Sequence, residues 1–69
     1  MQYTITLYWT VDYMGEVFPV RTIHERPNKR DAIAFARQCR SNWRLHDMGL
    51  RTISVAHPER GFIGRYQLR

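Results

Sequence analysis

The sequence predicts an α+β fold, in which a four-stranded antiparallel sheet carries one helix on one of its faces. Apolar and polar residues alternate in two stretches before residue 25 and in two after residue 49, which is the period of a half-buried strand. Between these stretches apolar residues recur at spacings of three and four, the period of a helix. The order is therefore ββαββ, and a helix that crosses over the first strand gives the sheet order 2-1-3-4. A β-grasp-like sheet, with the last strand parallel to the first, is the alternative.

The first two strands are expected to form a hairpin. Residues 2–12 alternate, with one face made of Tyr3, Ile5, Leu7, Trp9 and Val11. Residues 12–16 contain the Asp and Gly typical of a turn, and residues 17–24 alternate again, with Phe18, Val20 and Thr22 as the inward set. Pro19 predicts that the second strand lies at a sheet edge, because its missing N–H cannot join a ladder on both sides.

A helix is expected over residues 29–45. Pro27 and Asn28 break the preceding strand, and Asn28 followed by Asp31 resembles a capping box at a helix start. Gly49 is a stop signal after the helix. The face toward the sheet is expected to consist of Ala32, Phe35, Ala36, Cys39 and Trp43, with Trp43 stacked on Trp9 in the core.

The rest of the chain is expected to form a second hairpin. Residues 50–57 read as a strand with Ile53 and Val55 inward, and residues 58–61 read as a turn. Residues 62–68 then return with Phe62, Tyr66 and Leu68 inward. Because no linker, repeat or low-complexity segment interrupts the pattern, residues 1–69 are expected to form a single domain.

Charge and size indicate a binding protein that carries out no reaction. Eleven Lys and Arg against six Asp and Glu give a net charge of +5, which fits nucleic acid or an acidic protein surface as partner, although such charge also serves solubility alone. A domain of this size leaves little room for an enclosed active site or a small-molecule substrate. The single cysteine, Cys39, favours a reducing compartment, and the sequence shows neither a leader nor a membrane span. We therefore expect a cytoplasmic protein with no membrane contact.

The expected helix carries a row of arginines. Positions seven apart lie on nearly the same side of a helix, so Arg30, Arg37 and Arg44 form one stripe, with Arg40 beside it. No Asp or Glu occurs between Asp31 and Asp47, so these charges have few acidic neighbours along the helix. The stripe predicts contact with phosphates or carboxylates, while an ordinary solvated helix face is the alternative.

The sheet face away from the helix is the second candidate surface. An aromatic side chain beside arginines, here Tyr8 with Arg21, Arg65 and Arg69, suits the stacking of single-stranded nucleic acid. The alternative is the solvated side of an antiparallel sheet, on which Thr is common. The other residues expected on this face are Thr4, Thr6, Thr10, Ile23, Ile63 and Gln67.

Motifs for catalysis, metals or cofactors are not evident. Cys39 and the three histidines lack the spacing of a metal site, and no phosphate loop or nucleophile turn occurs. The segment 60–62 opens like an RNA-recognition strand motif but does not continue as one, and the GXXG at residues 61–64 is expected to enter a strand, whereas a KH loop joins two helices. We expect no enzyme activity, metal or cofactor.

The element order and size resemble small phage-encoded inhibitors, notably type I-F anti-CRISPR proteins. The resemblance covers residues 3–11, 18–23, 31–39 and 53–68. It implies a stoichiometric inhibitor that covers the nucleic-acid-binding surface of a host defence complex, such as a CRISPR ribonucleoprotein. A protein that binds DNA or RNA directly through the arginine stripe is the alternative, and an accessory subunit of a larger assembly is a third hypothesis.

Overall fold

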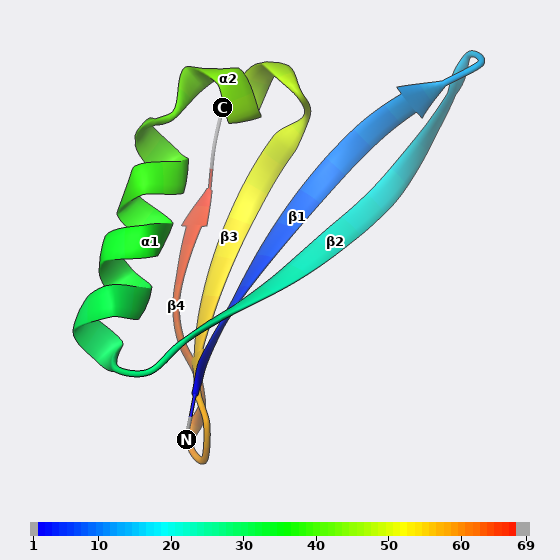
Figure 1. Cartoon of the computed structure of the whole chain (residues 1–69). Helices are drawn as coiled ribbons and strands as arrows, with labels where there is room; N and C mark the ends of the chain where they lie inside the picture. The colour runs from blue at the N-terminus through cyan, green and yellow to red at the C-terminus, as the bar shows by residue number, and fades with distance from the viewer. Residues whose placement is uncertain (1, 68–69) are drawn as a thin grey trace.

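The described part of the chain forms four strands and two helices (Figure 1). The computed structural model describes the backbone of residues 2–67 and the side chains of residues 2–65. The elements are β1 (Tyr3–Tyr13), β2 (Glu16–Arg26), α1 (Lys29–Ser41), α2 (Trp43–Asp47), β3 (Leu50–His57) and β4 (Gly61–Gln67). The sheet order is β2-β1-β3-β4 and every neighbouring pair is antiparallel. The predicted fold class and strand order are confirmed, and the β-grasp alternative is wrong because the strand beside β1 is the antiparallel β3 and not β4.

The first hairpin turns more tightly than expected. Tyr13 pairs with Glu16, so the turn consists only of Met14 and Gly15. Both have positive φ, 52° and 81°, as a type I′ hairpin turn requires. In this register Thr10 faces Pro19 across a pair that exchanges no hydrogen bonds, so the backbone nitrogen of Pro19 points outward from the edge strand. The predicted edge position of β2 is confirmed.

The expected helix is two helices. Asn28 caps α1: its Oδ1 accepts the Asp31 backbone N–H at 2.9 Å, as predicted from the capping pattern. α1 ends at Ser41 because Asn42 is extended, and the Oδ1 of Asn42 accepts the Arg44 backbone N–H at 3.1 Å to start α2. The prediction of one helix over residues 29–45 is therefore wrong at its last turn.

The core lies between α1 and the middle of the sheet. Its buried members are Ile5, Leu7, Ala32, Ala36, Cys39, Leu50, Ile53 and Val55. The two alanines bring the helix close to the sheet, and Phe35 packs at the margin under the Arg26 guanidinium, 4.3 Å from its ring centre. The predicted inward residues of β1, α1 and β3 are thus confirmed, apart from Val11 on β1 and Trp43 beyond α1, which are exposed.

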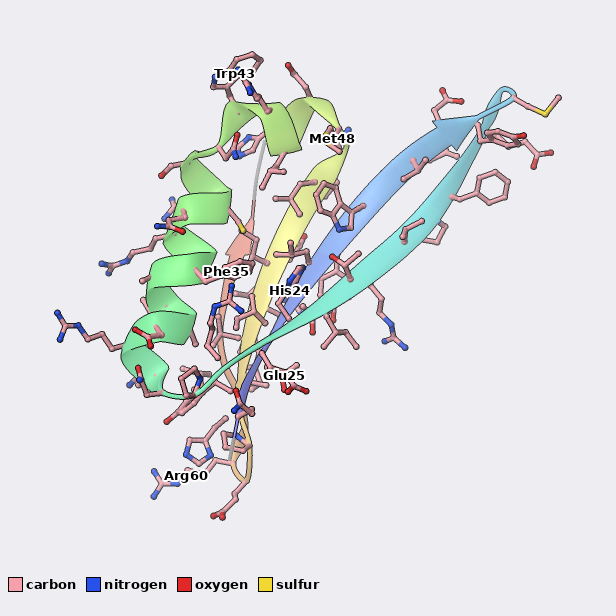
Figure 2. All side chains as sticks on the ribbon, in the orientation of Figure 1. His24, Glu25, Phe35, Trp43, Met48 and Arg60 are labelled. Carbon is pink, nitrogen blue, oxygen red and sulfur yellow. The ribbon has the colours of Figure 1, made fainter. Side chains whose placement is uncertain are left out.

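The expected pairing of tryptophans is wrong. Trp43 is 66% exposed because α2 starts beyond the end of the sheet-packed helix (Figure 2). Trp9 is partly buried against the core, and its indole N–H donates to the Thr22 hydroxyl at 3.0 Å. The two indoles therefore occupy separate environments.

A bulge reverses part of β4. Val55 pairs with Gly64 but Ala56 pairs with Phe62, so Ile63 is an extra residue in β4. Phe62 shares a face with Ala56 and is 62% exposed, whereas Ile63 packs against the core. The predicted sides of Phe62 and Ile63 are therefore wrong. Tyr66 pairs with Ile53 through its backbone, while its side chain and all of Leu68 lie outside the described residues.

The first hairpin extends beyond the helix that covers it (Figure 1). Thirteen helical residues span about 20 Å, whereas eleven strand residues span about 36 Å. Phe18 and Val20 lie on the helix side of the sheet as predicted, because they face Val11 and Trp9, yet both remain exposed. We call residues 9–20 the arm. The molecule is accordingly elongated, with extents of 40 × 21 × 15 Å.

Candidate functional site

Three predicted site residues meet on the sheet face opposite the helix. Tyr8 on β1 lies directly across from Arg21 on β2 and across from Thr52 on β3. A shallow cavity of about 310 Å³ is lined by Tyr8, Thr52 and Arg65, which brings the β4 arginine to the same aromatic ring. All three predicted side chains are exposed. The sheet therefore places one aromatic ring between two guanidinium groups.

Phe62 adds a second aromatic ring to this face. The Arg65 guanidinium lies 5.7 Å from the centre of the Phe62 ring, within cation–π range. Phe62 lies two strands and four residue steps from Tyr8, roughly 16 Å apart at ordinary strand spacing and rise. We call Arg21, Tyr8, Arg65 and Phe62 the diagonal track, since they cross the sheet from β2 to β4.

The floor of the diagonal track is small and polar. Thr6 and Ser54 pair across β1 and β3 between the two aromatic residues, and both are half-buried. Short side chains here leave the aromatic rings and guanidinium groups as the raised features of the face. Glu25 on β2, which pairs with Thr4 on β1, and Asp12 in the arm carry negative charge on the same side. Positive charge therefore lies along the track, and negative charge lies beside it.

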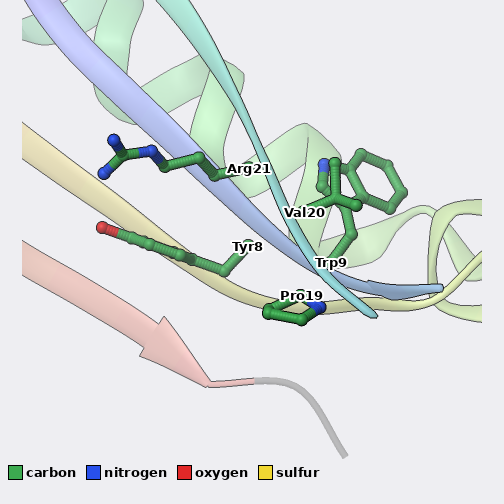
Figure 3. Close-up of a pocket in the computed structure, with 5 residues that line it drawn as sticks. All are labelled: Tyr8, Trp9, Pro19, Val20 and Arg21. Atoms are coloured by element: carbon green, nitrogen blue, oxygen red, sulfur yellow. The ribbon is translucent and has the colours of Figure 1, made fainter. Parts of the chain in front are cut away.

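A second hollow adjoins the track at the base of the arm (Figure 3). It encloses about 290 Å³ and is lined by Tyr8, Trp9, Pro19, Val20 and Arg21. In Figure 3 Tyr8 and Arg21 extend side by side from neighbouring strands, while Trp9 and Val20 lie on the other side of the hairpin. The two sides of the β1–β2 pair are thus chemically different.

The arginine stripe of the helix is only partly formed. Arg30 and Arg37 line one groove of about 600 Å³ with Lys29, Ile33 and Ala34. Arg40 is exposed on α1, and its carbonyl oxygen lies 2.7 Å from Nε2 of His46 across the bend at Asn42. Arg44 lies on α2, with its guanidinium 5.8 Å from the centre of the Trp43 ring. The expected single stripe ending at Arg44 is wrong, because its spacing assumed an unbroken helix.

The other residues expected on the sheet face include one that is exposed there and two that the structure does not describe in full. Ile23 is exposed there, in register with Thr6. Arg69 lies outside the described residues, as does the side chain of Gln67. Phe62 and the groove residue Lys29 were not among the predicted site residues. A glycine inside a strand often marks a bulge, so Gly64 is the sequence signal that could have indicated the bulge and the outward side of Phe62.

Cysteine and histidine form no evident reactive centre. Burial raises the pKa of the Cys39 thiol above its ordinary value of 9.0, and the nearby Arg26 charge opposes this only in part. Among the residues that the structure describes, no three of His, Cys, Asp and Glu gather as a metal-binding group. No helix in the described part of the chain is long and apolar enough to cross a bilayer.

Comparison with known proteins adds no assignment. No protein-family model matches the chain, and searches of curated proteins and of solved structures give no significant match. The two surfaces described above therefore carry the functional inference.

Proposed function

We propose that this chain is a non-enzymatic protein that binds single-stranded nucleic acid on the open face of its sheet. The observation that supports this proposal is the diagonal track, in which two exposed aromatic rings alternate with two arginines. Base stacking on aromatic rings tolerates any sequence, and the guanidinium groups attract the phosphates between bases. A cytoplasmic location belongs to the same proposal and is consistent with a free, buried Cys39.

Fluorescence anisotropy with labelled single-stranded oligonucleotides, DNA and RNA, tests this proposal. Replacing Tyr8→Ala should weaken binding by roughly 1–3 kcal/mol, which is about 5- to 150-fold, because one stacked base is lost. Replacing Arg65→Ala should reduce the slope of log affinity against log salt by about 0.7 for the phosphate contact removed. A matched duplex should bind more weakly, since its bases are not available for stacking.

Tyr13→Ala is the control variant for Tyr8→Ala. Tyr13 is another exposed tyrosine of β1, but it lies on the helix side of the sheet near the arm tip. Its replacement should leave affinity within twofold. Equal losses in the two variants, or no binding of single strands at low salt, would contradict the proposal.

The second candidate function is an inhibitor of the anti-CRISPR type, acting on a nucleic-acid-handling host complex. The groove on α1 favours it, because Lys29, Arg30 and Arg37 surround the apolar Ile33 and Ala34. A basic rim over an apolar floor suits an acidic protein surface better than bare phosphates. In this case the chain would block nucleic-acid binding by covering a site on the complex.

Capture of candidate CRISPR complexes from cell extract, with and without nuclease treatment, separates the two functions. A docking inhibitor should retain its protein partner after nuclease treatment and lose it when Arg30→Glu and Arg37→Glu are combined. If the Tyr8→Ala variant also retains the protein partner, the sheet face is not the surface that binds this partner. Recovery of nucleic acid alone, lost on nuclease treatment, would favour direct binding.

A further inference from the structure

The arm presents an apolar surface that the rest of the chain does not cover. Val11, Phe18 and Val20 lie on its helix side and are 38%, 42% and 42% exposed. These residues continue the face that α1 covers further along the sheet, so their exposure follows from the short helix. Contiguous exposed apolar side chains of this kind mark interaction surfaces.

The arm also differs in charge from the remainder of the chain. Residues 9–20 contain the carboxylates of Asp12 and Glu16 and no basic residue. The other residues contain all eleven basic side chains and only four carboxylates. The register places Glu16 on the same side of the hairpin as Phe18 and Val20, because it pairs with Tyr13. The apolar surface of the arm therefore carries a negative charge at its tip.

A surface of complementary character lies at the end of α2. Trp43 and Met48 are each 66% exposed, and the Arg44 guanidinium lies beside the Trp43 ring. Figure 2 shows Trp43 at the outer end of α2 and Met48 at the connection from α2 to β3. Trp and Arg are among the residues most enriched at the energetic centres of protein interfaces, and Met is enriched at interfaces in general.

We propose that two copies of this chain pair through these surfaces, the arm of each copy docking on the α2 end of the other. A twofold axis makes the contact occur twice, so one self-complementary chain forms a closed dimer. Glu16 of one copy then faces Arg44 of the other, and Phe18 and Val20 cover Trp43 and Met48. Continuous pairing between β2 edges is disfavoured, because Pro19 offers no N–H on the outer side of the arm.

This dimer does not depend on the proposed nucleic-acid site. Tyr8 and Arg21 lie on the open face of the sheet, whereas Glu16, Phe18 and Val20 lie on the helix side. The Tyr8→Ala variant should therefore bind nucleic acid more weakly and self-associate like the parent chain. Failure of either proposal is distinguishable from failure of the other.

Sedimentation velocity over protein concentrations from about 1 µM to about 1 mM tests the dimer, since weak interfaces have affinities in this range. Glu16→Arg and Arg44→Glu should each weaken self-association by at least about tenfold, the usual scale for a lost interface charge pair. In a heterodimer of the two variants both docking contacts pair opposite charges, one of them native and the other with its charges exchanged, so mixing the variants should restore association. Phe18→Ser should abolish association without altering net charge.

Glu59→Arg is the control for charge reversal. Glu59 is exposed in the turn between β3 and β4, at the end of the molecule remote from the arm tip (Figure 1). This variant should dimerise like the parent. A parent chain that stays monomeric at every concentration would overturn the proposal. A dimer that tolerates Glu16→Arg, Arg44→Glu and Phe18→Ser would overturn it as well, because its interface would lie elsewhere.

Discussion

Replacing Gly49→Ala should destabilise the fold more than any other single methyl group added at a described glycine. Gly49 follows α2, and its backbone φ is 109°, a value that residues other than glycine rarely adopt. A Cβ atom at this position would overlap the Thr10 carbonyl oxygen and lie 3.1 Å from its carbon. The obstruction is backbone, so no side-chain rotation relieves it.

The expected loss of stability combines two terms. Forcing a positive φ on alanine costs roughly 1–3 kcal/mol. Separating the two segments also weakens the hydrogen bond from the Thr10 N–H to the Gly49 carbonyl, now 2.8 Å, which contributes about 1 kcal/mol. A total near 3 kcal/mol is a large share of the free energy of unfolding expected for a chain of this length, which is roughly 3–10 kcal/mol. It corresponds to a fall in melting temperature of roughly 10–25 °C.

Thermal and urea unfolding followed by circular dichroism measure this loss. Gly15→Ala is the matched control, because Gly15 also has positive φ but has no atom within 4 Å of the added Cβ. It should cost only the conformational term, about 1 kcal/mol. Equal stabilities of the two variants would refute the close approach between Gly49 and Thr10.

Three further predictions concern the helices and the core. Asn28→Ala should lower the free energy of unfolding by about 1 kcal/mol in urea titration, because the cap of α1 is lost. Folding raises the pKa of Cys39, so the stability that its thiol contributes is complete below pH 9.0 and declines as pH rises above it. The parent should therefore lose more stability than Cys39→Ala between neutral and alkaline pH, and equal losses would contradict the burial of the thiol. Trp43→Ala should change stability by less than about 0.5 kcal/mol, whereas Trp9→Ala should cost several times more.

Strand alternation predicted the faces of the sheet but could not reveal how far the helix covers them. The period-two pattern of β1 and β2 is the same in the core and in the arm, because it reports which residues share a side. How much of the sheet face the helix covers depends on the length of α1, and α1 ends where Asn42 begins α2. Phe18 and Val20 thus lie on the predicted face and remain exposed.

The break at Asn42 had a local signal that periodicity concealed. Cys39 and Trp43 are four residues apart and continue the apolar spacing, which favours one helix. Asn is also a strong helix-starting residue, and its side chain here captures the Arg44 N–H. The capping hydrogen bond stabilises a new start, so Trp43 and Arg44 leave the line of α1. Phe62 was misplaced for a similar reason, since one bulged residue reverses strict alternation.

The predicted residues of the sheet face lie together although the helix break and the β4 bulge were not predicted. Their arrangement depends on shorter-range features of the chain than the helix stripe does. Tyr8 and Arg21 are held opposite each other by the register of one hairpin, which the two-residue turn at Met14 and Gly15 sets. A slip of one residue would move Arg21 to the helix side, so the turn chemistry also determines which face of the sheet carries Arg21. Arg65 follows the β4 bulge in the sequence. The bulge therefore does not affect the pairing of Arg65 with Ser54. The arginine stripe instead required an unbroken helix over the fifteen residues from Arg30 to Arg44, and the capping side chain of Asn42 divides that segment.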